Sequence, residues 1–149
     1  GGGRVKVELK KVQHFPAGSE ETECFTAELW VNGLRRGNVS NDGHGGSHRF
    51  TDYSAEIELR EATADRDADT YVNEAFQLAL DEKAMTRLLK KRAVYVERET
   101  GLLLSINLGA GREIEIMRPK LEALGRLVLN GLPKDQALDL YRHFATEAA

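Results

Sequence analysis

The chain has 149 residues, of which 41% are hydrophobic and 30% charged, a balance typical of a folded globular domain and not of a disordered chain. A formal net charge of −3 gives no bulk electrostatic reason to bind nucleic acid or a membrane surface. No apolar run reaches the roughly 18–20 residues of a membrane helix, and the start of the chain lacks the apolar core of a signal peptide. We expect one domain over residues 1–149, with Gly1–Gly3 as an expression remnant or disordered tip.

The first sixty residues carry strand patterns. Arg4–Phe15 alternates apolar and charged residues with a period of two, which predicts a half-buried strand. Cys24–Val31 and Leu34–Ser40 flank Asn32-Gly33, a pair that tolerates the positive φ angles of a type I′ turn and therefore predicts a hairpin. Ser54–Ala62 alternates again, and this pattern favours a fourth strand over the start of a helix.

Asp67–Arg92 has the pattern of one long amphipathic helix. Apolar residues recur at spacings of three, four and seven, at Tyr71, Ala75, Leu78, Met85 and Leu89. Acidic residues precede and open it (Asp65, Asp67, Asp69), and Lys90, Lys91 and Arg92 end it. This arrangement complements the helix dipole. We favour that interpretation over a phosphate-binding patch at the basic end.

The last third of the chain predicts shorter elements. These are a hairpin of Ala93–Glu97 and Leu102–Leu108, a short strand at Ile114–Ile116, helical turns at Lys120–Arg126, a short strand at Leu127–Leu129 and a helix with Pro133 at its first position. Strands followed by helices, without strict β-α-β alternation, predict an α+β fold. We expect a mostly antiparallel sheet, built from an N-terminal meander and a later hairpin, covered by one long helix, with a C-terminal helix.

Cys24 is the only cysteine, so no disulfide can form within the chain. This suits a reducing cytoplasm, where we expect the protein to act. A lone cysteine in an apolar strand is more often a small core residue than a reactive thiol, which needs a neighbouring base.

The stretch NDGHGGSH, Asn41–His48, is the strongest candidate for a site. Glycine-rich loops hold anions because bare backbone amides converge on a phosphate. However, Gly43, Gly45 and Gly46 match neither the P-loop nor the dinucleotide-binding spacing, and no Lys follows them. Two simpler interpretations remain. The stretch is a surface turn shaped by these glycines, or it is a loop that binds a ligand or partner.

The two histidines of this loop allow two further interpretations. His44 and His48, with Asp42 or Asp52, are candidate metal ligands, but the glycines between them argue against the helical His pair of zincins. His44 is also a candidate general base, oriented by a carboxylate from Asp42, Asp52 or the preceding loop. Neither spacing is specific, so we predict no metal and no cofactor.

A second polar loop, Ser19–Glu23, follows the first expected strand, and Asn41–His48 follows the third. In an antiparallel meander both loops leave the same end of the sheet, which predicts that Glu20 and Glu21 lie near His44 and His48. The candidate ligand-binding residues are Glu20, Glu21, Asn41, Asp42, Gly43, His44, Gly45, Gly46 and His48, and any catalysis would use His44 and His48. Trp30, Arg35 and Arg36 lie at the opposite end and suit a packed aromatic with a charged rim better than a nucleic-acid surface.

Three stretches resemble a family of small uncharacterised proteins of bacteriophages and bacterial mobile elements. They are SEETECF (residues 19–25), VSNDGHGG (39–46) and VLNGLPKDQALDLYR (128–142). The family has no established function, so the resemblance implies only a small intracellular protein of viral type. Phage proteins of this size often bind and neutralise a host factor or signalling molecule.

These observations leave two main functions open, besides a purely structural role. We favour a binding protein that captures a ligand, anionic or nucleotide-like, or a host protein through the Gly/His loop. The alternative is a small His-dependent or metal-assisted phosphodiesterase. Binding is favoured because an enzyme more often shows a denser set of titratable residues at motif spacing. The sequence names neither the partner nor the oligomeric state.

Overall fold

The computed structural model describes residues 5–62 and 67–148, with side chains up to Phe144. Gly1–Gly3, Arg4 at the start of the first expected strand and Asp65 before the long helix lie outside the described residues. The chain divides into two compact units, Gly1–Leu80 (unit 1) and Asp81–Ala149 (unit 2), and the boundary falls inside helix α2. The expectation of a single domain over residues 1–149 stays a prediction.

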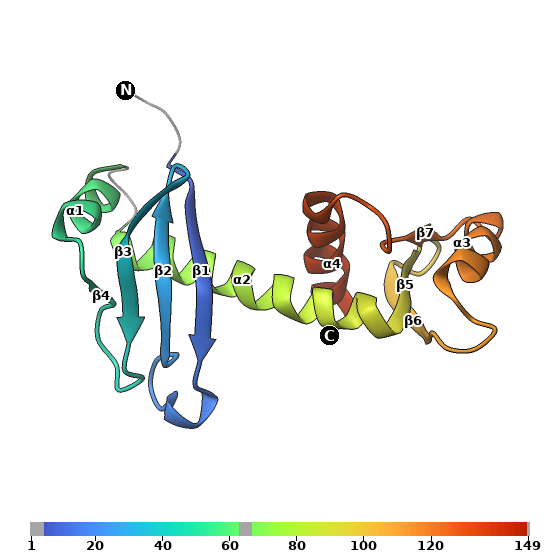
Figure 1. Cartoon of the computed structure of the whole chain (residues 1–149), viewed down its shortest axis with the longest axis horizontal. Helices are drawn as coiled ribbons and strands as arrows, with labels where there is room; N and C mark the ends of the chain where they lie inside the picture. Colours follow the sequence, from blue (N-terminus) through green and yellow to red (C-terminus); the bar gives the residue numbers. More distant parts are fainter. Residues whose placement is uncertain (1–4, 63–66, 149) are drawn as a thin grey trace. The chain divides into compact units, whose positions relative to one another are not determined.

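Unit 1 contains a four-stranded antiparallel sheet in the order β1-β2-β3-β4 (Figure 1). Its strands are β1 (Val7–His14), β2 (Phe25–Val31), β3 (Leu34–Asn41) and β4 (Arg49–Phe50). Asn32 and Gly33 join β2 to β3 with φ angles of 51° and 81°, the positive values of a type I′ turn. The predicted meander and hairpin are confirmed. β1 is interrupted between Lys10 and Gln13 by an irregularity, where Lys11 has a φ of 51°.

Two helices cover one face of this sheet. A short 3-10 turn η1 (Pro16–Gly18) follows β1, then α1 (Tyr53–Ala62) and α2 (Ala68–Lys91) follow β4. The core combines alternate strand residues with the helices: Leu9, Phe25, Ala27, Leu29, Val31, Val39, Ala55, Leu59, Ala68, Tyr71, Val72, Ala75 and Phe76. Alternate residues of β2 are buried, and the predicted apolar stripe of α2 is buried at Tyr71, Ala75 and Met85.

The segment Ser54–Ala62, expected as a strand, is helical instead, and that expectation is wrong. Ala55 and Leu59 lie four residues apart, and both are 0% exposed. This spacing belongs to an alternating pattern and also to one face of a helix, so the alternation does not separate the two. Asp52 decides locally, because its carboxylate accepts a hydrogen bond from the Ala55 amide at 3.2 Å and starts the helix.

Unit 2 contains a three-stranded antiparallel sheet in the order β6-β5-β7. Its elements are β5 (Arg92–Glu97), β6 (Leu102–Asn107), α3 (Ile114–Ala123), β7 (Leu127–Val128) and α4 (Lys134–Ala148). The second hairpin, the short strand near residue 127 and the C-terminal helix are confirmed. Pro133 directly precedes α4, and its carbonyl accepts the Ala137 amide at 3.0 Å.

The short strand expected at Ile114–Ile116 is also wrong, since these residues open α3. Ile114, Met117 and Leu121 pack against Ala93 and Tyr95 of β5, with the spacing of one helix face. Pro119 lies inside this helix, which runs on to Ala123. The alternation of Ile114 and Ile116 with glutamates is therefore a property of the sequence that the helix does not use.

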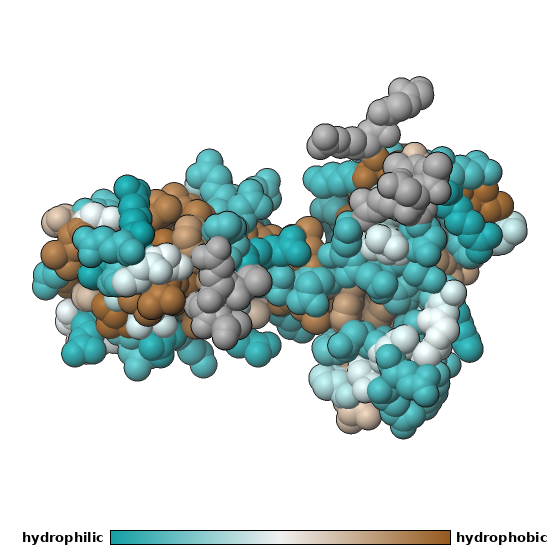
Figure 2. Space-filling model, turned by 180° about the vertical axis from the view of Figure 1, so that it is seen from behind, coloured by the Kyte–Doolittle hydropathy of each residue, from teal (hydrophilic) through white to brown (hydrophobic). Residues whose placement is uncertain are grey.

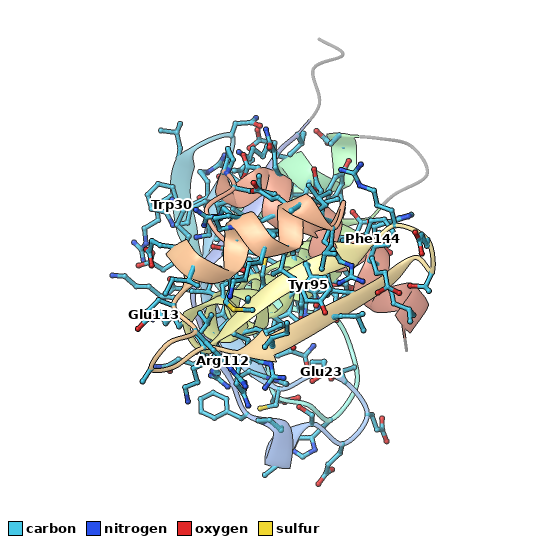
Figure 3. All side chains as sticks on the ribbon, turned by 90° about the vertical axis from the view of Figure 1, so that its right-hand side faces the viewer. Glu23, Trp30, Tyr95, Arg112, Glu113 and Phe144 are labelled. Carbon is cyan, nitrogen blue, oxygen red and sulfur yellow. The ribbon has the colours of Figure 1, made fainter. Side chains whose placement is uncertain are left out.

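Asn130 connects the end of α2 to β5 inside unit 2. Its buried side chain accepts a hydrogen bond from the Val94 amide at 2.8 Å and donates to the carbonyls of Leu89 (3.2 Å) and Arg92 (2.9 Å). One side-chain amide thus satisfies the Leu89 carbonyl at the end of α2 together with the Arg92 carbonyl and the Val94 amide of β5. Tyr95, labelled in Figure 3, lies on β5 with the Arg126 guanidinium 5.4 Å above its ring.

The surface of unit 1 is largely hydrophilic on the face shown in Figure 2. Unit 2 shows more hydrophobic residues on its viewed face, and its exposed large apolar side chains are Leu102, Ile116 and Leu124. Within residues 5–62 and 67–148, no helix is long and apolar enough to cross a membrane.

Candidate functional site

The two polar loops of unit 1 meet at one end of its sheet. The Gly43 carbonyl accepts hydrogen bonds from three consecutive amides, Glu20 (3.0 Å), Glu21 (2.8 Å) and Thr22 (3.3 Å). The expected proximity of the loops that follow the first and third strands is therefore confirmed. We call residues 18–24 and 41–48 together the loop edge.

Asn41 at the end of β3 organises the loop edge from inside, where its side chain is 4% exposed. Its Oδ1 accepts hydrogen bonds from the Thr22 hydroxyl at 2.6 Å and the Gly43 amide at 2.9 Å. Its Nδ2 donates to the Gly46 carbonyl at 3.3 Å and lies 3.2 Å from His48 Nδ1. All the hydrogen-bonding atoms of this buried amide are therefore used, as burial requires.

The ring of His48 is held by both of its nitrogens. Because Asn41 Oδ1 accepts two hydrogen bonds, Asn41 Nδ2 is the donor and His48 Nδ1 the acceptor. His48 Nε2 then carries the hydrogen and donates to Asn73 Oδ1 at 2.6 Å. The His48 amide donates to Asp69 Oδ1 at 2.9 Å, and its ring meets the edge of Phe25 at 5.4 Å. His48 thus ties the loop to the start of α2.

His44 occupies a different environment. Its Nδ1 lies 3.0 Å from Glu20 Oε2, and the two side chains are 63% and 66% exposed. The structure therefore gives His44 a solvent-exposed carboxylate partner, while His48 uses both ring nitrogens elsewhere. The two histidines are not arranged as a metal-binding or acid–base pair. Within the described parts of the chain, no group of three or more His, Cys, Asp and Glu side chains could hold a metal ion.

The remaining predicted site residues have structural partners. Asp42 accepts a hydrogen bond from the His44 amide at 3.1 Å and lies 3.5 Å from the Arg49 guanidinium. Glu21 packs against Gly45, where its Oε2 lies 2.6 Å from the position that a Cβ atom would take. Asp52 is not at the loop edge, because it caps α1.

The backbone amides of the loop edge are occupied by the chain itself. The amides of residues 20–22 converge on one oxygen atom, as in an anion-binding nest, but this oxygen is the Gly43 carbonyl. The amides of Gly43 and Gly45 donate to the side chains of Asn41 and Thr22. The glycine-rich loop is therefore a rigid, internally bonded turn, and these amides are not free to hold a phosphate.

A pocket of about 240 Å³ opens beside the loop edge. It is lined by Thr22, Glu23, Phe25, Gly46, His48, Asp69, Asn73 and Phe76. Phe25 and Phe76 stack at 4.4 Å between ring centroids, and the Glu23 carboxylate lies 2.6 Å from His14 Nε2. Figure 3 shows Glu23 at this end of unit 1, with Trp30 towards the hairpin end.

Three of the pocket residues come from α2 and were not among the predicted site residues. From the sequence, Asp69 is expected to complement the helix dipole, and Asn73 and Phe76 are expected only to be part of the long helix. The sequence offers a weak signal for Asn73, a polar residue next to the apolar stripe. Nothing in the sequence pattern shows that the first turns of α2 reach the loop edge, because that depends on how the helix lies across the sheet.

The hairpin end of unit 1 matches the interpretation of a packed aromatic with a charged rim. The Lys10 ammonium lies 3.9 Å from the centroid of the Trp30 ring, whose Nε1 donates to Glu28 at 3.3 Å. Arg36 joins β3 to α1 through Glu58 and Asp52, and hydrogen bonds to these carboxylates raise the pKa of its guanidinium.

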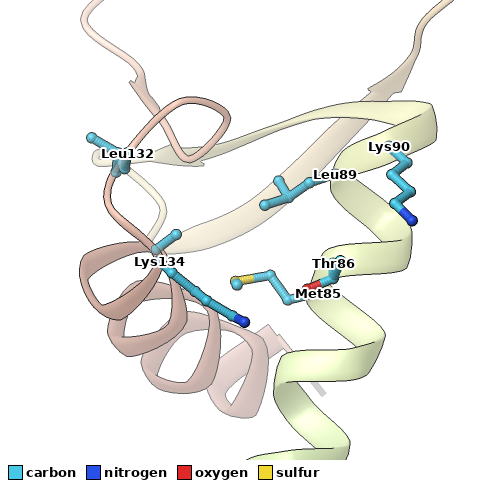
Figure 4. Close-up of a pocket in the computed structure, with 7 residues that line it drawn as sticks. Met85, Thr86, Leu89, Lys90, Leu132 and Lys134 are labelled. Atoms are coloured by element: carbon cyan, nitrogen blue, oxygen red, sulfur yellow. The ribbon is translucent and has the colours of Figure 1, made fainter.

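Unit 2 has a groove of about 390 Å³ between the end of α2 and the start of α4 (Figure 4). Its lining consists of Met85, Thr86, Leu89, Lys90, Leu132, Lys134 and Ala137. Lys134 is paired with Glu82, and the Lys90 side chain points away from Met85 and Leu89. Neither ammonium group therefore faces the groove unpaired, and nothing in its lining selects a particular ligand.

Comparison of the chain with protein-family models, curated proteins and solved structures finds no match.

Proposed function

We propose that this chain is a non-catalytic binding protein that captures its ligand or a host protein at the loop edge of unit 1. The observation that carries the proposal is the pocket beside this edge, where two loops and the start of α2 converge. Its walls are fixed before any ligand arrives, because Asn41, Thr22 and His48 form one connected hydrogen-bond network. A rigid site binds with a smaller loss of conformational entropy than a flexible loop does.

As part of this proposal, the protein acts in the cytoplasm and is of phage type. Its partner is a protein or a small molecule of a bacterial host. The proposal does not need catalysis. Both ring nitrogens of His48 are used to hold the loop, which supports a role for His48 in positioning the loop. The loop-edge amides form hydrogen bonds within the chain, so the proposal does not depend on their binding a phosphate group.

The test is affinity capture from a bacterial lysate, with mass spectrometry of the proteins and small molecules retained. Asn73→Trp fills the pocket from the surface of α2, whereas Arg35→Ala alters the hairpin end as a matched control. We expect the wild-type chain and Arg35→Ala to retain the same partner and Asn73→Trp to lose it. Equal capture by all three proteins, with folding verified by circular dichroism, would contradict the proposal.

A hydrolase is the second candidate, and one observation favours it. His44 Nδ1 faces the Glu20 carboxylate at 3.0 Å, an arrangement in which the carboxylate orients the ring and leaves Nε2 to act as a base. The test is hydrolysis of bis-(4-nitrophenyl) phosphate by the wild-type chain and by His44→Ala, together with metal analysis of the purified protein. No turnover, or turnover unaffected by His44→Ala, removes this candidate.

A further inference from the structure

The charges around the loop-edge pocket indicate which chemical class of ligand it binds, which the proposed function leaves open. We infer that the pocket binds a positively charged group, the ammonium of a lysine or the guanidinium of an arginine side chain. This inference rests on the proposed function, since it concerns the same pocket. It replaces an anionic ligand with a cationic one.

Two carboxylates line the pocket, and among the described residues no Lys or Arg does. Asp69 is half-buried, and its Oδ1 accepts the His48 amide, while Oδ2 has no hydrogen-bond partner among the described residues. Glu23 uses Oε2 for His14, and its Oε1 is likewise without a partner in the described part of the chain. The half-buried Asp69 gains more than Glu23, whose side chain is 55% exposed, from a donor that also carries positive charge.

The rest of the pocket lining also suits a cation with an apolar stem. Both ring nitrogens of His48 are held by Asn41 and Asn73, so the ring competes for neither carboxylate. Phe25 and Phe76, stacked on each other and only 1% and 4% exposed, form an apolar wall against which the methylene groups of a long side chain can pack. At about 30 Å³ for each water in the liquid, 240 Å³ equals roughly eight water molecules, enough for one long side chain.

The electrostatic surroundings point the same way. Glu20, Glu21 and Asp42 lie on the loop edge itself, and Asp67 directly precedes α2. Among the described residues, Arg49 is paired with Asp42, and Arg60, which lines an adjoining pocket with Asp67 and Asp69, is paired with Glu56. An approaching anion would therefore meet several negative charges, whereas a cation would be attracted.

The experiment titrates the full chain with four small probes and follows amide shifts by NMR. The probes are N-acetyl-lysinamide, N-acetyl-argininamide, the uncharged N-acetyl-norleucinamide and the anionic N-acetyl-glutamic acid amide. We expect the two cations to shift the amides of Gly46, His48 and Asn73, and the other two probes to bind at least about fivefold more weakly.

Two substitutions remove charge and keep the hydrogen bonds. Glu23→Gln can still bond to His14, and Asp69→Asn can still accept the His48 amide. We expect each to weaken binding of the cationic probes about fivefold or more. Asp139→Asn is the control, because this exposed carboxylate of α4 lies outside the loop edge and does not line the pocket, and it should change binding less than twofold.

The outcomes separate the two proposals. Equal binding of norleucinamide and lysinamide, or no effect of Glu23→Gln and Asp69→Asn, would overturn the cationic ligand. If lysinamide does not bind but Asn73→Trp still abolishes partner capture, the ligand class is wrong and the proposed function stands. If lysinamide binds in the pocket and partner capture is unaffected by Asn73→Trp, the cation site stands and the proposed function fails.

Discussion

At the scale of single residues, the glycines of the Gly/His loop differ in what they do. Gly43 has a φ of 85°, and a Cβ atom there would lie 2.0 Å from the Gly18 carbonyl oxygen. Gly46 has nearly the same φ, 89°, but nothing lies within 4 Å of its Cβ position. Gly43 therefore permits the close approach of two backbone segments, whereas Gly46 is needed only for its positive φ angle.

This difference gives a matched pair of substitutions. Gly46→Ala should lower the free energy of unfolding by about 1–2 kcal/mol, the cost of a left-handed conformation for a residue with a Cβ atom. Gly43→Ala should cost about 2–5 kcal/mol, because overpacking against Gly18 adds to the same strain. Urea denaturation followed by the fluorescence of Trp30, the only tryptophan, measures both. Equal losses would contradict the close approach.

The loop edge was predictable in outline, but its internal bonding was not. Antiparallel topology alone placed Glu20 and Glu21 beside the Gly/His loop, and the structure confirms this. The roles of His44 and His48 were not predictable, because they depend on the partners Glu20, Asn41 and Asn73. Hydrogen-bond partners from distant parts of a chain leave no periodic signal in its sequence.

At the scale of elements, both helices that cover the sheet of unit 1 follow an aspartate. Asp52 accepts hydrogen bonds from Ser54 Oγ at 2.5 Å and from the Ala55 amide. Asp67 accepts from the Thr70 amide and hydroxyl, both at 2.8 Å. These hydrogen bonds lower the pKa of both carboxyl groups, with Ser54 as the largest cause for Asp52 and the Thr70 amide for Asp67.

The lowered pKa of Asp52 predicts a loss of stability in acid. A carboxyl group whose pKa is lower in the folded state stabilises the fold above its unfolded value, here 3.8, and this contribution disappears as the pH falls through the lower, folded value. Asp52→Asn should therefore be less stable than the wild type at neutral pH, and the difference should shrink below about pH 4. Urea midpoints measured between pH 7 and pH 3 test this.

The control for this series is Asp139→Asn on the exposed face of α4. Its difference from the wild type should stay small across the same pH range. A difference for Asp52→Asn that does not change with pH would contradict the ionised cap.

The elements themselves show where sequence patterns are sufficient. Longer patterns, such as the stripe of α2 and the hairpin of β2 and β3 around Asn32-Gly33, predicted the element bounds within one or two residues. Short ones failed at Ser54–Ala62 and at Ile114–Ile116, both of which are helical. Within Ser54–Ala62, Ala55 and Leu59 at i and i+4 satisfy both periods, whereas Ile114–Ile116 is too short to define a period, so burial on the rest of the fold decides.

At the scale of the whole molecule, α2 belongs to both units, because its residues extend on either side of the boundary at Leu80. Its first half is buried in the core of unit 1, and Met85 is buried in unit 2. A helix forms cooperatively along its length, so melting one end costs hydrogen bonds towards the other. This continuity favours unfolding of the two units in a single transition.

Paired core substitutions test the expected coupling. Val96→Ala in unit 2 should destabilise the chain by about 1–3 kcal/mol. If the units unfold together, it should shift the Trp30 fluorescence midpoint of unit 1 as much as the circular dichroism midpoint of the whole chain. Val39→Ala in unit 1 is the matched substitution and should give the same coincidence. A Trp30 midpoint that Val96→Ala leaves unchanged would instead show two independently unfolding units.

The irregularity in β1 has a consequence for how the protein behaves among copies of itself. Within the described part of unit 1, β1 is the outermost strand of its sheet, and an outer strand edge is a template on which a strand from another molecule could pair. The left-handed turn at Lys11 interrupts the pairing of β1 with β2 between Lys10 and Gln13, and Lys10 and Lys11 in the strand and Lys6 just before it add positive charge. An interrupted, charged edge disfavours the edge-to-edge pairing that begins aggregation. Unit 1 can therefore carry an open sheet at high concentration without recruiting its neighbours.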